Sequence, residues 1–170
     1  MSEKRAIGLA YIKVGPVGVD GDMGNVLAAL GVTYKDSADL TQAADAETEI
    51  NSEENDDPEE IITVRGKKTL KWSIMDYNPD TLVKVLGGTV TGVAPNEVWN
   101  DGGVTPNLEM SIEFKEKKNN VVCRIPRAKI SAVINWKLSS KGVALVDITA
   151  TVMTPTKAGV KNIQIGNPAV

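Results

Sequence analysis

The stretch KWSIMDYNPDTLVKVLGGTV, residues 71–90, predicts a strand, a short helix and a second strand in close succession. Before it and within it, Leu70, Trp72 and Ile74 alternate with polar residues. This period of two is the pattern of a strand with one buried face. The stretch is the part of the chain in which local chemistry specifies structure most tightly.

The helix is expected to have a defined start and a defined end. Asn78 can cap it by accepting a hydrogen bond from a free amide of the first turn, and Pro79 suits the first helical position. Gly87 and Gly88 end it, because glycine adopts the left-handed conformation cheaply. One apolar stripe for docking is formed by Leu82, Val85 and Leu86. Such a short helix is unstable alone, so we expect it to pack on the flanking strands.

The last third of the chain predicts an antiparallel meander. Residues 108–114, 128–138 and 144–152 alternate between apolar and polar side chains, and short polar turns separate them. We therefore predict a mainly β fold, an antiparallel β-sandwich or barrel with one short flanking α-helix. Free strand edges of such a sheet are available for pairing with a partner chain.

Length and charge predict one soluble domain covering residues 1–170. We expect flexible loops at 15–24, which is rich in glycine, and at 51–60, which is strongly acidic. The net charge of −3 argues against nonspecific attraction to nucleic acid or anionic membrane. Because no secretion signal or membrane-length apolar run is evident, we expect a soluble protein made in the cytoplasm, without a membrane partner.

The sequence offers little catalytic or metal-binding chemistry. It has no histidine and no phosphate-binding glycine loop, and its single cysteine, Cys123, alternates with apolar residues like a buried structural thiol. Asp20 and Asp22 resemble the start of a calcium loop, but Gly31 stands where the closing glutamate is required. We therefore predict no enzyme activity, no metal and no cofactor.

Aromatic residues make up only 4% of the chain, which argues against a sugar-stacking cleft. Trp72 and Trp136 fall on the apolar faces of predicted strands and are expected in the core. Trp99 stands beside a glycine-rich turn and is the candidate for an exposed contact.

The segment from Trp72 to Thr89, in its setting between strands, resembles the major tail (tail tube) proteins of long-tailed bacteriophages. The features that carry the resemblance are an aromatic-ended strand, a short helix with a leucine-rich face and a Leu-Gly-Gly close. The matching residues are Trp72, Asp76, Pro79, Leu82, Leu86, Gly87 and Gly88. With the long strands that follow, the resemblance covers roughly residues 60–153.

The resemblance implies a structural virion protein of a phage or prophage. Such subunits associate into rings, usually hexameric, which are assembled in the host cytoplasm and stack into a hollow tail tube. DNA passes through the tube at ejection without specific binding. Tape-measure, tail terminator and initiator proteins are the further partners that the resemblance implies.

A DNA conduit is expected to avoid positive charge on its inner surface. Two sets of acids are candidates for that lining, one with Asp45, Glu47 and Glu49 and the other with Glu109 and Glu113. The acidic run 53–60 is alternatively expected to order at a contact between rings.

Three other interpretations stay open at this point. The same fold serves in the tube of type VI secretion and in other injection devices. A β-sandwich can also bind carbohydrate or protein through its loops, here near residues 99–105. An enzyme that uses carboxylates alone is the third.

Overall fold

The computed structural model describes residues 5–75 and 77–167, and strands dominate it, with 49% strand and 5% helix. The predicted fold class, mainly β with antiparallel sheets and one short helix, is confirmed. The strands are β1 (Leu9–Pro16), β2 (Asp39–Gln42), β3 (Ala46–Ser52), β4 (Asn55–Val64), β5 (Lys68–Ile74), β6 (Thr89–Thr91), β7 (Val98–Asn100), β8 (Leu108–Glu116), β9 (Val122–Trp136), β10 (Ala144–Val152) and β11 (Gln164–Gly166). The helix is α1 (Pro79–Leu86).

The main sheet has the strand order β1-β8-β9-β10-β5-β2, and β11 pairs beside it with β9. All its strand pairs are antiparallel, and β8, β9 and β10 follow one another as the predicted meander. In register, Val146 of β10 lies opposite Ile134 on one side and Ile74 on the other. The core-facing residues of three strands are thereby aligned in one row.

The sheet curls so that strands from opposite parts of its order share one core. Ile12 and Val14 of β1 belong to the same buried cluster as Leu70 and Trp72 of β5. The two ends of the sheet do not pair with each other, so no closed barrel forms among the described strands. The arrangement is consistent with a β-sandwich rather than a barrel. β1 and β2 are the two edges of the strand path.

Helix α1 begins and ends as its sequence predicts. The Asn78 side chain accepts a hydrogen bond of 3.0 Å from the amide of Asp80, and Pro79 occupies the first turn. Gly87, with φ of 77°, ends the helix while its amide donates to the Val83 carbonyl at 3.0 Å. Asp76, one of the residues that carry the resemblance, lies outside the described residues.

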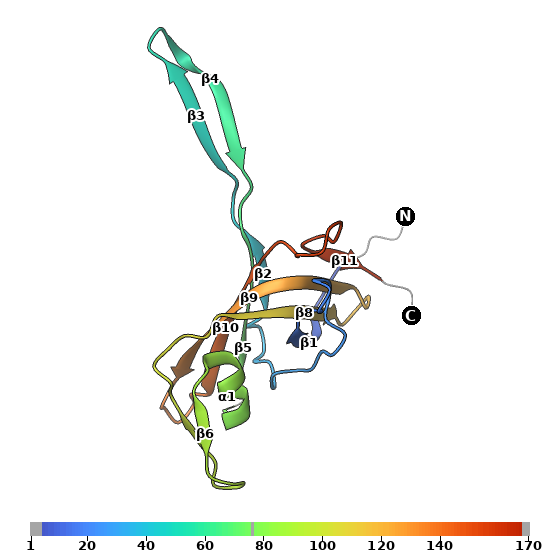
Figure 1. Cartoon of the computed structure of the whole chain (residues 1–170), viewed down its shortest axis with the longest axis vertical. Coiled ribbons are helices and arrows are strands. Elements are labelled where there is room, and N and C mark those ends of the chain that lie inside the picture. The colour runs from blue at the N-terminus through green and yellow to red at the C-terminus, as the bar shows by residue number, and fades with distance from the viewer. Residues whose placement is uncertain (1–4, 76, 168–170) are drawn as a thin grey trace.

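The segment 51–60, predicted to be a flexible loop, belongs instead to a hairpin. Its first residues complete β3 and the rest form most of β4, and the two strands pair antiparallel from Ala46 opposite Val64 to Ser52 opposite Asn55. We call the hairpin of residues 46–64 the arm. Figure 1 shows the arm extending away from the body, on the side opposite α1.

The segment 15–24 starts within β1 and then lacks regular structure through most of its length. It is nevertheless tied to the body at two points. The Gly24 amide donates to Ser111 Oγ at 2.9 Å, and this buried hydroxyl donates onward to the Pro126 carbonyl at 2.6 Å. At the other point, Lys157 Nζ lies 2.7 Å from Asp20 and 3.0 Å from Asp22.

Candidate functional site

The arm has two different faces because side chains alternate along a strand and directly opposite residues share a face. Glu47 lies opposite Thr63, and Glu49 lies opposite Ile61, which places two acids on one face. The other face pairs Ala46 with Val64, Thr48 with Ile62 and Ile50 with Glu60. The arm is therefore an amphipathic two-stranded ribbon.

The apolar face of the arm is open to solvent. Ile50 is 45% exposed, Ile62 46% and Val64 60%. No residue of β3 or β4 belongs to the core cluster or packs against it. Contiguous exposed aliphatic side chains on a protruding element mark a surface that another molecule covers.

Every charged side chain in the arm is acidic, as the printed sequence shows for residues 46–64. Of the first set of candidate lumen acids, Glu47 and Glu49 are exposed on β3. Asp45 precedes β3 and accepts a hydrogen bond of 2.9 Å from the Gly66 amide at the base of the arm. These three acids therefore stand together at and near the base of one protruding element.

The second set of candidate lumen acids is placed differently. Glu109 lies 2.8 Å from Arg127, and Glu113 lies 2.9 Å from Arg124. The side chain of Glu113 is only 15% exposed and that of Glu109 32%. The hydrogen bond from Arg127 also holds the pKa of Glu109 below its usual value. Because an arginine neutralises each acid, this face of β8 and β9 supplies no net negative charge.

Helix α1 docks as its apolar stripe predicts. Leu82 and Val85 are buried at 5% and 2% exposure, and Leu86 packs against the core cluster while staying partly buried. The hydroxyl of Thr81 donates to the Leu30 carbonyl at 3.1 Å. The helix touches β9, β6 and β7, so it covers one end of the core.

Gly88 lies where the chain leaves the helix and meets the β6–β7 hairpin. Its φ is 86°, and a Cβ added there would collide with the Asn100 carbonyl. Glycine is therefore required at this position for both conformation and space.

The structure corrects two of the three tryptophan predictions. Trp72 is buried at 2% exposure, as expected. Trp99, the candidate for an exposed contact, is half-buried against the core, and its indole donates to the Gly87 carbonyl at 2.8 Å. Trp136, expected in the core, is 46% exposed and meets the Tyr77 ring edge-on at 6.4 Å.

Trp136 belongs to a second exposed apolar surface, which we call the end patch. Its members lie at the end of β9, in the turn after it and just beyond β5. They are Tyr77 (67% exposed), Ile134 (43%), Trp136 (46%), Leu138 (92%) and Val143 (39%). Ile134 and Trp136 continue the core-facing row of β9 beyond the point at which the core covers it.

Three observations describe the titratable groups outside the arm. Burial raises the pKa of the Cys123 thiol to about 11, so it is protonated and unreactive at neutral pH. The hydrogen bond from Lys157 lowers the pKa of Asp20, and this ammonium stands where a calcium ion would have to bind. Among residues 5–75 and 77–167, no group of three or more His, Cys, Asp and Glu side chains is placed to hold a metal ion.

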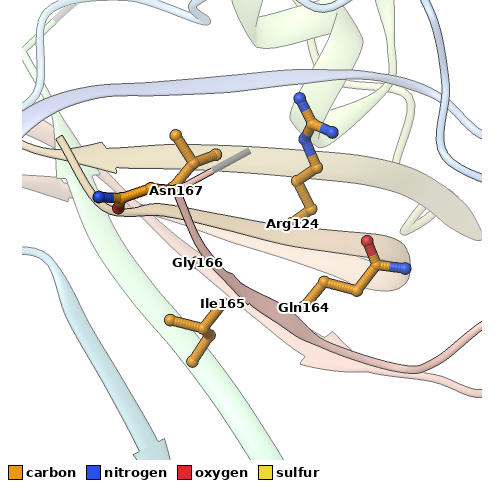
Figure 2. A pocket seen from close by; sticks show the side chains of 6 residues that line it. Arg124, Gln164, Ile165, Gly166 and Asn167 are labelled. Atoms are coloured by element: carbon orange, nitrogen blue, oxygen red, sulfur yellow. The ribbon is translucent and has the colours of Figure 1, made fainter. Parts of the chain in front are cut away.

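The concave surfaces of the body include a pocket and a groove. A small pocket of about 250 Å³ lies along β11 and is lined by Arg124, Gln164 and Ile165, among others (Figure 2). A larger groove of about 860 Å³ lies between the β1 and β2 regions and is lined by Leu9, Leu40 and other residues. The lining of the groove also includes ionisable side chains, among them Tyr34, Asp36 and Glu116.

No protein-family model matches this chain. No curated protein matches it either.

The one helix that the structure describes is α1, and none in the described part of the chain is long and apolar enough to cross a membrane. The arm and the end patch are exposed apolar surfaces that are available for contact with another molecule.

Proposed function

We propose that this chain is a structural subunit that self-assembles into stacked rings, forming the tail tube of a phage or prophage through which DNA passes. The observation that carries the proposal is the arm, an amphipathic ribbon that stands outside the body with its apolar face uncovered. The sequence resemblance to tail tube proteins is the reason for proposing stacked rings as the form of assembly.

An arm of this kind favours a partner on physical grounds. An isolated two-stranded hairpin is marginally stable in water, because it gains too little burial to offset the loss of chain entropy. Ile50, Ile62 and Val64 gain that burial only when a second surface covers them. A second copy of the chain is always present at the same concentration as the first, so self-association is the simplest way to cover the arm.

The sheet offers further surfaces for assembly. β1 and β2 end the strand path. Part of the β1 edge is covered, because Val14 exchanges two backbone hydrogen bonds with Ala28. The unpaired backbone groups of an edge strand such as β2 can pair with a neighbouring chain. A contact between two different surfaces, repeated from copy to copy, closes into a ring or continues as a filament according to its rotation.

The charge of the arm suits a conduit for DNA. Glu47 and Glu49 lie on the face opposite the aliphatic residues, so they stay exposed when the apolar face is covered. Carboxylates repel phosphate, and a lumen lined with them does not retain the DNA that moves through it. We therefore assign these two acids, with Asp45, to the inner surface of the tube.

Size-exclusion chromatography and negative-stain electron microscopy of the concentrated protein test the proposal. We expect the elution volume to fall as concentration rises, and rings or tubes with a stain-filled centre to appear. Compact dimers without a central hole would refute the tube and leave self-association as the only part of the proposal that stands.

A further inference from the structure

The arm and the end patch lie at opposite ends of the same strand. The arm joins the body just before Lys68, the first residue of β5, whereas Tyr77 of the end patch follows Ile74, its last residue. A strand advances roughly 3.3 Å per residue, so about 20 Å of sheet separates the two ends. Figure 1 shows that the arm also points away from α1, the helix that follows β5. A chain therefore cannot lay its arm on its own end patch.

The two surfaces both expose apolar side chains, and they carry charges of opposite sign. The arm presents Ile50, Ile62 and Val64, and the end patch presents exposed apolar side chains around Trp136. All charged residues of the arm are acidic. From Ile134 to Val146 the charged residues are Lys137 and Lys141, and both are exposed. Apolar contact and opposite charge thus favour the same pairing.

We propose that the apolar face of the arm of one copy docks on the end patch of the next copy. The proposal deepens the function proposed above and rests on it. Because the two surfaces differ, each contact leaves one free arm and one free end patch, and the contact repeats head to tail. This geometry joins successive copies along the direction of β5 and leaves Glu47 and Glu49 uncovered.

Neighbouring residues on opposite faces provide matched variants for the test. Ile62→Asp places a carboxylate on the apolar face, while Ile61→Asp makes the same change on the acidic face at nearly equal exposure, 46% against 49%. On β9, Ile134→Asp is compared with Val133→Asn, because successive strand residues face opposite ways and a carboxylate at position 133 would lie directly opposite Asp147. Sedimentation velocity at one fixed concentration measures the assembled fraction, and circular dichroism checks that each variant is folded.

We expect Ile62→Asp and Ile134→Asp each to lower the assembled fraction about tenfold or more, since a carboxylate cannot be buried on an apolar surface without a partner. Ile61→Asp and Val133→Asn should stay within about twofold of the unmodified chain. Equal loss in both members of a pair, or no loss in either, would overturn the proposed docking.

A mixing experiment tests whether the two surfaces meet each other. The Ile62→Asp chain keeps a functional end patch, and the Ile134→Asp chain keeps a functional arm. Each alone should sediment as a monomer, and a one-to-one mixture should form dimers that grow no further. A mixture that stays monomeric would overturn the pairing of arm with end patch.

Imaging of the unmodified chain separates this inference from the proposed function. Hollow assemblies that persist in the Ile62→Asp chain would overturn the docking and leave the tube intact. The unmodified chain could instead form solid filaments that are absent from the Ile62→Asp chain. This result would support the docking and overturn the proposed tube. An unmodified chain that stays monomeric at every concentration would overturn both.

Discussion

Removing the arm separates its contribution to assembly from any contribution to folding. The base of the arm is closed by a hydrogen bond of 2.9 Å from the Ala43 amide to the Lys67 carbonyl. Replacing residues 45–65 by an Asn-Gly turn therefore keeps β2 and β5 connected by a short hairpin. We expect this armless chain to fold normally and to remain monomeric.

The expected change in the free energy of unfolding follows from the contacts that the arm makes with the body. Its residues are exposed throughout, with Ser52 alone partly covered, and none reaches the core cluster. A single substitution at such an exposed position changes the free energy of unfolding by less than about 0.5 kcal/mol, and the arm contributes no buried contact whose loss would add to this. Shortening the connection roughly fourfold removes two doublings of loop length, which stabilises the body by at most about 1.2 kcal/mol.

Urea denaturation of dilute monomers, followed by circular dichroism, measures the free energy of unfolding of both chains. We expect the armless chain to be as stable as the unmodified one or slightly more stable. A loss greater than about 2 kcal/mol would show that the arm packs on the body, as buried aliphatic residues do. Normal assembly of the armless chain would show that the arm is not the assembly element.

Three further predictions concern the helix end, acid stability and the lumen. Gly88→Ala should lower the free energy of unfolding by about 1–3 kcal/mol in urea melts, because its φ is positive and the added methyl meets the Asn100 carbonyl; an unchanged midpoint would contradict this. Burial acts to raise the pKa of Glu116, but amide donors including Ile7 and Asn119 outweigh it and hold that pKa below its usual value. The stabilisation is therefore present above the unfolded-state pKa and is lost as pH falls through the lower folded value, so Glu116→Gln should flatten the acid side of the stability profile. Glu47→Lys with Glu49→Lys should slow DNA ejection from assembled particles in a fluorescence assay, and an unaltered rate would remove these acids from the lumen.

The strands and helix ends were predictable because local chemistry decides them. The alternation through β8, β9 and β10 predicted their pairing, and Asn78, Pro79 and Gly87 predicted where α1 begins and ends. A cap contributes about 1 kcal/mol through groups within one turn, so it depends little on the rest of the fold.

The outer part of the arm, residues 51–60, was predicted to be a loop because its composition argues against a strand. Six acids and Pro58 lie between residues 53 and 60, and both acids and proline are rare in strands. A two-stranded ribbon tolerates both kinds of residue. Each strand has an outer edge without a paired strand, so a proline that lacks the amide there loses no hydrogen bond. Both faces of the ribbon are in water, so the acids stay solvated. The alternation of Glu47 and Glu49 with Ile50 was the available signal for the first strand.

The tryptophans show that sequence periodicity predicts the strand face of a residue but not its burial. Alternation predicts which face of β9 carries Trp136, but it does not predict whether another element covers that face. Here the core ends before the strand does, so Trp136 is exposed. Trp99 is half-buried because the helix end provides a carbonyl for its indole, a tertiary contact that local sequence does not reveal.

Cryo-electron microscopy of the concentrated, unmodified protein tests the central claim most directly. The account predicts hollow rings or tubes in which each copy contacts the next through different surfaces, with the arm of one copy on the Trp136 region of its neighbour. A compact dimer related by a two-fold axis, with no central channel, would contradict it.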